Sequence, residues 1–195
     1  DTLEWIRQRR IPHLYVTNTT SRSRASLLQK FESLGFEANL DEVMTPIVAA
    51  SRWLTEHGAQ RMALFVPEDA QQDFNEFESL PLDRVTAVDA VVIGDLGEAW
   101  DYRRLNQAFR FLLQEPRPEL IALGMTRYWR ADDGLRLDVA PFVRALEYAA
   151  SCEALVMGKP APAFFEASLE LLGCHAEQAL MIGDDIVADI DAAQR

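Results

Sequence analysis

The chain has 195 residues, of which 49% are hydrophobic and 26% are charged, a composition typical of a folded globular protein and too apolar for intrinsic disorder. Acidic residues outnumber Lys and Arg by 31 to 19, and the resulting net charge of −12 argues against nucleic acid or an anionic membrane as a partner. No apolar run approaches the roughly 20 residues that a membrane-spanning helix needs. Two cysteines outside any CxxC motif favour a reducing, cytoplasmic compartment.

The first part of the chain predicts a strand and two helices. A short apolar strand is expected at residues 14–16, and the amphipathic helix after it should stop at Gly35. Thr45 and Pro46 are typical of an N-cap and the first residue of a helix, which should end near Gly58.

Alternation of strands and helices continues through the middle of the chain. Residues 62–66 predict a strand, and the acidic stretch 67–84 predicts a loop with a short helix. A buried strand is then expected at 90–94, an amphipathic helix at 102–112 and another strand at 120–123.

The last third predicts a turn, two helices and two strands. Residues 131–134 are typical of a turn, and a helix should begin at Pro141. A strand at 154–157, a helix at 162–172 and a strand at 179–182 follow. Strands and helices that alternate at these lengths indicate an α/β fold with a parallel sheet.

Three of the predicted strands are followed by polar residues. In an open parallel sheet, ligands bind at the carboxyl ends of the strands, so these residues are the candidates for a site. They are Thr17, Asn18 and Thr19 after the first strand, Lys159 after the strand ending at 157, and Asp184 and Asp185 after the strand ending at 182, with Asp189 one helical turn further on. Hydroxyls, an amide, one ammonium and an acidic cluster together are the parts of a phosphate and Mg²⁺ site.

Each residue type suits a particular part of that chemistry. Thr17 and Asn18 can donate neutral hydrogen bonds to phosphate oxygens, and Lys159 supplies a positive charge that can bridge a phosphate and a carboxylate. Asp184 and Asp185 offer the hard oxygen ligands that Mg²⁺ prefers. Taken singly, the first two segments are more typical of a helix cap and a solvated loop, and the third fits a helix cap as well as a metal site. The three together, in this order, favour a functional site.

These segments resemble three of the four motifs of the haloacid dehalogenase (HAD) superfamily, subclass IIA. The matching segments are residues 16–20, 156–160 and 181–185 with Asp189, and the likeness extends to 105–110 and 141–149. The resemblance implies a Rossmann-like, parallel-sheet HAD core with an inserted α/β cap of the C2 type. The core would comprise residues 1–45 and 151–195, and the cap residues 46–150.

The resemblance also implies a Mg²⁺-dependent phosphatase that acts on a small phosphorylated compound through an aspartyl-phosphate. In that case Thr17, Asn18 and Thr19 would bind the phosphoryl group, and Lys159 would be the catalytic lysine that orients it. The metal site would consist of Asp184, supported by Asp185 and Asp189. Because relatives in this superfamily often pair through their caps, a homodimer formed through the cap is a further expectation.

The chain departs from the superfamily in its first motif. The pattern D-x-D-G-[TS], which supplies the nucleophilic aspartate, is absent from residues 1–195 and would lie before the second motif. We therefore expect a truncated chain that is inactive as given. A second departure, at residues 137–140, lies where relatives tend to have a glycine-containing loop. The alternative is a non-catalytic phosphate- or protein-binding module; a phospho-acceptor receiver domain is less favoured, because it places its acidic pair before its lysine.

Overall fold

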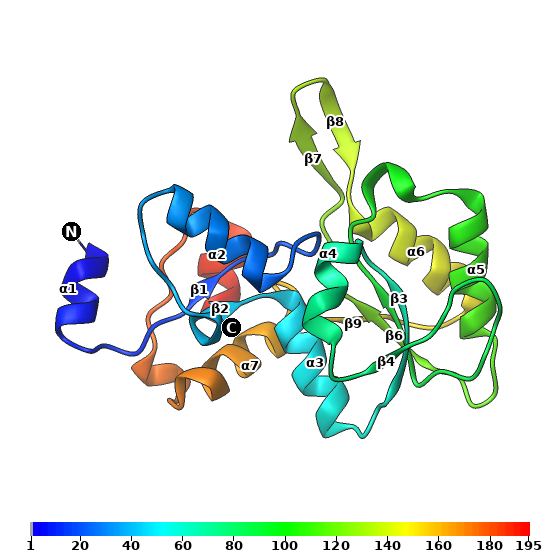
Figure 1. The fold of residues 1–195 in the computed structure, drawn as a ribbon, viewed down its shortest axis with the longest axis horizontal. Coiled ribbons are helices and arrows are strands. Elements are labelled where there is room, and N and C mark those ends of the chain that lie inside the picture. The colour runs from blue at the N-terminus through cyan, green and yellow to red at the C-terminus, as the bar shows by residue number, and fades with distance from the viewer. Residues whose placement is uncertain (1) are drawn as a thin grey trace.

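The structure, a computed structural model, describes residues 2–195 and is built around a parallel sheet of five strands (Figure 1). The strands lie in the order β4 (Glu78–Ser79), β3 (Arg61–Phe65), β5 (Ala90–Ile93), β6 (Glu119–Ala122) and β9 (Leu155–Val156). Every residue of β5 is buried, as expected of a central strand that has helices on both faces. The predicted α/β fold with a parallel sheet is confirmed.

Side chains that alternate along the strands divide the interior into two apolar layers. On one face Leu64 and Val92 pack with α3 (Pro46–Glu56) and α7 (Pro162–Leu172). On the other face Phe65 and Ile93 pack with α5 (Tyr102–Leu112) and α6 (Val139–Ala150). Both layers are apolar because successive residues of a strand point to opposite faces of the sheet.

A smaller unit lies beside this sheet and carries the first candidate segment. It consists of β1 (Tyr15–Val16), which pairs in parallel with β2 (Val43–Met44), and of α2 (Arg24–Ser33). The chain begins near it with α1 (Thr2–Gln8), and the orange and red C-terminal segment returns to the same side of the molecule (Figure 1).

A β-hairpin projects from the body of the molecule (Figure 1). Its strands, β7 (Tyr128–Ala131) and β8 (Gly134–Leu137), pair only with each other within the described residues. The turn predicted at 131–134 is present, but the flanking strands were not predicted. Three of the four residues in each strand are exposed, so neither strand has the buried face whose alternating pattern would reveal it.

Local end signals placed several helices correctly. The Thr45 hydroxyl accepts a hydrogen bond from Val48 N at 3.3 Å, and Pro46 is the first residue of α3. Gly173 ends α7 in the left-handed conformation at φ 65°. Helix α6 begins at Val139, two residues before the predicted start, because Asp138 rather than the chain around Pro141 supplies its cap.

The strand predicted at 179–182 does not form. These residues have no strand partner within the described chain, and Leu180 and Ile182 are 83% and 73% exposed. An apolar run becomes a strand only when a neighbouring strand accepts its backbone hydrogen bonds. β9, which belongs to the predicted core segment 151–195, pairs with β6 of the predicted cap segment 46–150.

No helix within residues 2–195 is long and apolar enough to cross a membrane.

Candidate active site

The loop that follows β1, residues 17–23, lies against the carboxyl edge of the five-stranded sheet. Asp95, just after β5, donates a backbone hydrogen bond to the Thr20 hydroxyl at 3.2 Å, and Thr20 is buried. Gly124, just after β6, is close enough that a Cβ placed there would lie 3.9 Å from the Thr20 methyl group. The first candidate segment therefore meets the sheet edge at which parallel folds bind ligands.

Asn18 holds the backbone of Lys159 in a reciprocal pair of hydrogen bonds. Its Nδ2 donates to the Lys159 carbonyl at 2.9 Å, and its Oδ1 accepts from the Lys159 amide at 2.8 Å. Gly158 is required at this contact, since a Cβ there would lie 2.5 Å from the Leu123 carbonyl oxygen. The two predicted site residues are thus brought together, with most of the Asn18 amide engaged in positioning the lysine.

The Lys159 side chain is paired with Asp189. The distance from Lys159 Nζ to Asp189 Oδ1 is 2.5 Å, and the two side chains are only 9% and 6% exposed. The second oxygen of Asp189 accepts from Asp185 N at 3.2 Å. A buried carboxylate with both oxygens engaged fixes the lysine ammonium and joins the third candidate segment to the second.

The hydroxyls of Thr17 and Thr19 lie side by side. Their Oγ1 atoms are 2.8 Å apart, and Thr17 Oγ1 also accepts from Thr19 N at 3.2 Å. Thr17 N donates to the Met44 carbonyl at 3.1 Å, which continues the β1–β2 pairing by one residue. Hydroxyl groups rotate to suit a partner, so this half-buried pair can turn a donor toward an anion.

The acidic segment offers two exposed carboxylates with different roles. Asp185 Oδ1 accepts from Val187 N and Ala188 N, both at 2.9 Å, and so caps the short π-helical turn Ile186–Asp191. Asp184 is exposed and makes no hydrogen bond within residues 2–195. Over the same residues no group of three or more His, Cys, Asp and Glu is arranged to hold a metal ion. The oxygen chemistry of Asp184 and Asp185 nevertheless suits Mg²⁺, which usually takes one or two carboxylates and keeps water as its other ligands.

Two carboxylates of the short helix α4 (Glu68–Gln71) and the turn after it hold the far end of the loop. Asp69 Oδ2 accepts from Ser23 N at 2.9 Å, and its Oδ1 accepts from the hydroxyls of Ser23 and Ser26 at 3.1 and 3.0 Å. Asp73 Oδ2 accepts from Arg24 N at 2.7 Å. Sequence reasoning missed both aspartates, because their partners are more than 40 residues away in the chain.

Replacement of Asp69 tests this attachment. The hydrogen bond from Ser23 N holds the pKa of Asp69 below its ordinary value, aided by the hydroxyls of Ser26 and Ser23 and opposed by burial. Since the unfolded state then binds more protons, Asp69 stabilises the fold at neutral pH and loses that contribution as the pH falls below about 4. We expect Asp69→Asn to lower the free energy of unfolding by about 2 kcal/mol at pH 7, and by less in acid.

Urea unfolding at several pH values measures this difference. Glu68→Gln is the matched control, since Glu68 is the exposed neighbour of Asp69 on α4, and it should change the unfolding free energy by less than about 0.5 kcal/mol. If Asp69→Asn lowered the free energy of unfolding by the same amount at pH 7 and at pH 3, the assigned hydrogen bonds would be contradicted.

A second pair of carboxylates lies near the same sheet edge. Asp138 caps α6 by accepting from Val139 N at 2.8 Å. Burial raises the pKa of Asp138 above its ordinary value, and the negative charge of Asp95 adds to the rise. Asp95 is the residue that donates to Thr20, so the sheet edge presents acidic groups beside the loop rather than extra cations.

The chain belongs to the family of haloacid dehalogenase-like hydrolases. Residues 1–78 match the family model described as haloacid dehalogenase-like hydrolase, and residues 156–195 match the model described as HAD-hydrolase-like. The two matched regions contain every candidate residue predicted from the sequence.

Among named relatives, the chain is similar to phospholysine phosphohistidine inorganic pyrophosphate phosphatase from Homo sapiens. The two are 39% identical over 190 residues, which cover 97% of this chain and 68% of the relative. It is 40% identical over 194 residues to haloacid dehalogenase-like hydrolase domain-containing protein 2 from Mus musculus, covering 100% of this chain and 71% of that one. The fold matches p-nitrophenyl phosphatase from Archaeoglobus fulgidus with a TM-score of 0.88 at 23% identity, over 98% of this chain and 73% of that one.

Proposed function

We propose that the protein is a Mg²⁺-dependent phosphatase that acts on a small phosphorylated compound. The observation that carries the proposal is the lysine held on three sides: its ammonium on buried Asp189, and its backbone amide and carbonyl on Asn18. A lysine with a purely structural role would not need both its backbone and its ammonium held in place beside a loop that carries hydroxyl groups. A lysine that contacts a phosphoryl group at a fixed point needs both to be held, because positioning is a large part of phosphoryl-transfer catalysis.

The chain's own residues have distinct parts in the proposed reaction. The hydroxyls of Thr17 and Thr19 donate to phosphoryl oxygens, and Lys159 places one positive charge beside them. Asp189 keeps the ammonium oriented, and Asn18 fixes the backbone that carries it. Asn18 retains one amide hydrogen beyond the one it donates to Lys159, which is enough for a single further donation to phosphate.

The proposed chemistry has two displacements at phosphorus. An aspartate oxygen forms a bond to phosphorus while the bond to the leaving oxygen or nitrogen breaks, and water then displaces the carboxylate to release inorganic phosphate. Residues 1–195 contain no D-x-D-G-[TS] pattern, so we propose that the attacking carboxylate comes from residues outside this range. The chain spans 68% of the length of the human relative.

Asp184 and Asp185 are the residues proposed to hold Mg²⁺. Both are exposed, and Asp184 has no other partner among the described residues. When bound, Mg²⁺ would offset negative charge on the phosphoryl oxygens. Asp189 is proposed to support the site through Lys159 and the Asp185 amide, to which it is already bonded.

A non-catalytic phosphate- or protein-binding module is the second candidate. It is favoured by one observation, the lack of a nucleophile motif in residues 1–195. The binding groups of the first two segments would serve a bound phosphate as well as a reacting one, because neither the threonine hydroxyls nor Lys159 changes covalently in the proposed reaction.

Hydrolysis of p-nitrophenyl phosphate with and without Mg²⁺ separates the two candidates. The assay compares the natural-length protein with residues 1–195 alone. We expect metal-dependent turnover from the natural-length protein and none from residues 1–195. Phosphate binding by both, with turnover by neither, would support the binding module and reject the phosphatase.

We propose that the protein resides in a reducing, cytoplasmic compartment. Cys152 and Cys174 are free thiols, and burial raises the pKa of Cys152, which keeps it protonated and unreactive.

We also propose that the protein forms a homodimer through the cap. The exposed apolar side chains of the β7–β8 hairpin, Trp129 and Leu135 among them, would be covered in such a dimer. Sedimentation equilibrium of wild type and of Leu135→Asp tests this, since a monomeric wild type would reject the dimer.

A further inference from the structure

A cavity of about 330 Å³ opens between the first turns of α5 and the segment that follows β4. Phe65, at the end of β3, forms part of its apolar wall together with Leu82. None of the residues in the candidate active site lines it. Its size falls at the lower end of the range of small-molecule sites.

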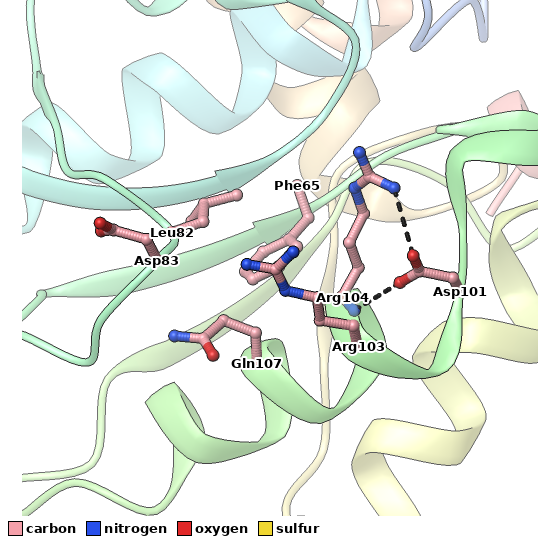
Figure 2. Close-up of a pocket in the computed structure, with 7 residues that line it drawn as sticks. All are labelled: Phe65, Leu82, Asp83, Asp101, Arg103, Arg104 and Gln107. Atoms are coloured by element: carbon pink, nitrogen blue, oxygen red, sulfur yellow. Dashed lines mark hydrogen bonds and ion pairs between the residues drawn. The ribbon is translucent and has the colours of Figure 1, made fainter.

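One side of the cavity carries two side chains of α5 that lack partners. Figure 2 shows Arg103 and Gln107 projecting from the same side of this helix toward the segment that carries Leu82 and Asp83. Within residues 2–195 Arg103 makes no hydrogen bond or ion pair, and the Gln107 Nε2 atom is buried without a hydrogen-bond partner. A buried amide nitrogen without an acceptor is costly, so this wall is short of one acceptor.

The charges around the cavity favour one negative charge on a ligand. The guanidinium of Arg104 is already compensated, because it lies 3.6 Å from Asp101 and donates to the Ala99 carbonyl at 2.6 Å. Asp83 points its carboxylate away from Arg103 in Figure 2. Arg103 is therefore the one uncompensated cation of the lining, and a dianion such as phosphate would leave one charge unmatched beside Asp101 and Asp83.

We propose that this cavity binds a small organic carboxylate, whose two oxygens face Arg103 and whose apolar body packs on Phe65 and Leu82. The planar fork of a guanidinium matches a carboxylate with two parallel hydrogen bonds. The site lies on α5 and the sheet and does not depend on the proposed phosphatase activity.

Calorimetric titration of the full chain with sodium benzoate tests the proposal. Benzoate joins one carboxylate to a flat apolar ring, which suits a wall made by Phe65. We expect saturable binding of one benzoate per chain and at least a tenfold weaker Kd in Arg103→Gln, since a hydrogen bond to a charged group is worth about 1.5–3 kcal/mol. Gln107→Glu should abolish binding, because its carboxylate would occupy Arg103 four residues earlier on the helix.

Arg110→Gln is the matched control, an exposed arginine in the last turn of the same helix and outside the cavity, and its Kd should stay within about twofold of wild type. Thermal melting confirms that the variants are folded. Three results would overturn the proposal: no saturable benzoate binding by wild type, equal affinity in Arg103→Gln, or displacement of benzoate by inorganic phosphate.

Discussion

Asp184→Asn in the natural-length protein is expected to lower Mg²⁺-dependent hydrolysis of p-nitrophenyl phosphate by about a hundredfold or more. A carboxylate that holds a divalent ion contributes several kcal/mol to the transition state through that ion, and each 1.36 kcal/mol is a factor of ten in rate. Asp184 is exposed and has no partner among the described residues, so the amide costs the fold little. The loss should therefore appear in the rate and in the Mg²⁺ concentration needed for half-maximal activity, while the melting temperature stays unchanged.

Asp191→Asn is the control for Asp184→Asn. Asp191 is an exposed aspartate of the same segment and forms an ion pair with Arg195. Within the described chain it makes no hydrogen bond to any of the predicted phosphate-binding residues. Its substitution should leave the rate and the Mg²⁺ dependence within about twofold of wild type. Wild-type turnover in Asp184→Asn would reject the assignment of this residue to the metal.

Lys159→Met is expected to destabilise the fold by about 3–5 kcal/mol, because it leaves the Asp189 carboxylate buried without its cation. Both side chains of the pair are almost completely buried, so water cannot replace the lost partner. The double variant Lys159→Met/Asp189→Asn removes both charges while keeping an acceptor for the Asp185 amide. It should recover more than half of the stability lost in the single variant.

Urea unfolding measures these differences, and the chain offers its own control. The only other lysine, Lys30, is exposed on α2, and Lys30→Met should change the unfolding free energy by no more than about 0.5 kcal/mol. If Lys159→Met were as stable as wild type, or if the second substitution restored nothing, the buried ion pair would not be what holds this lysine. Both Lys159 variants should also lose phosphatase activity, since neither retains the ammonium.

Predictions from the sequence were reliable where the local structure depends on interactions between residues that are close together in the chain. The cap made by Thr45, the first-turn Pro46 and the left-handed Gly173 each satisfy backbone groups of their own helix, so the local sequence determines the helix end. The strands β3, β5 and β6 were predicted from continuous apolar runs, which is what burial on both faces of a parallel sheet produces.

The failures arose where structure depends on distant partners. Residues 179–182 form a continuous apolar run, as a buried strand would, but no described strand lies beside them. The β7–β8 hairpin escaped notice because neither of its faces is buried. In both places burial, which local sequence does not report, decided the outcome.

Sequence reasoning named candidate site residues but not the contacts between them. Thr17, Asn18, Thr19 and Lys159 were found because each follows a predicted strand. The reciprocal bond between Asn18 and the Lys159 backbone joins residues 141 positions apart, and the contribution of Asp69 depends on packing between two units. Roles for Asp184, Asp185 and Asp189 as metal ligands are still predictions, and the Asp184→Asn experiment tests the first of them.

The reciprocal bond between Asn18 and Lys159 has a consequence for the order of folding. The bond joins residues 141 positions apart, so the loop after β1 and the segment after β9 must meet before the site exists. Closing so long a loop is entropically costly, which makes such contacts late events along a folding route. β9 is a two-residue strand at the sheet edge, and its detachment would carry away the lysine, its link to Asp189 and the Asn18 clamp in one opening. The site would then be lost cooperatively while the rest of the sheet persists.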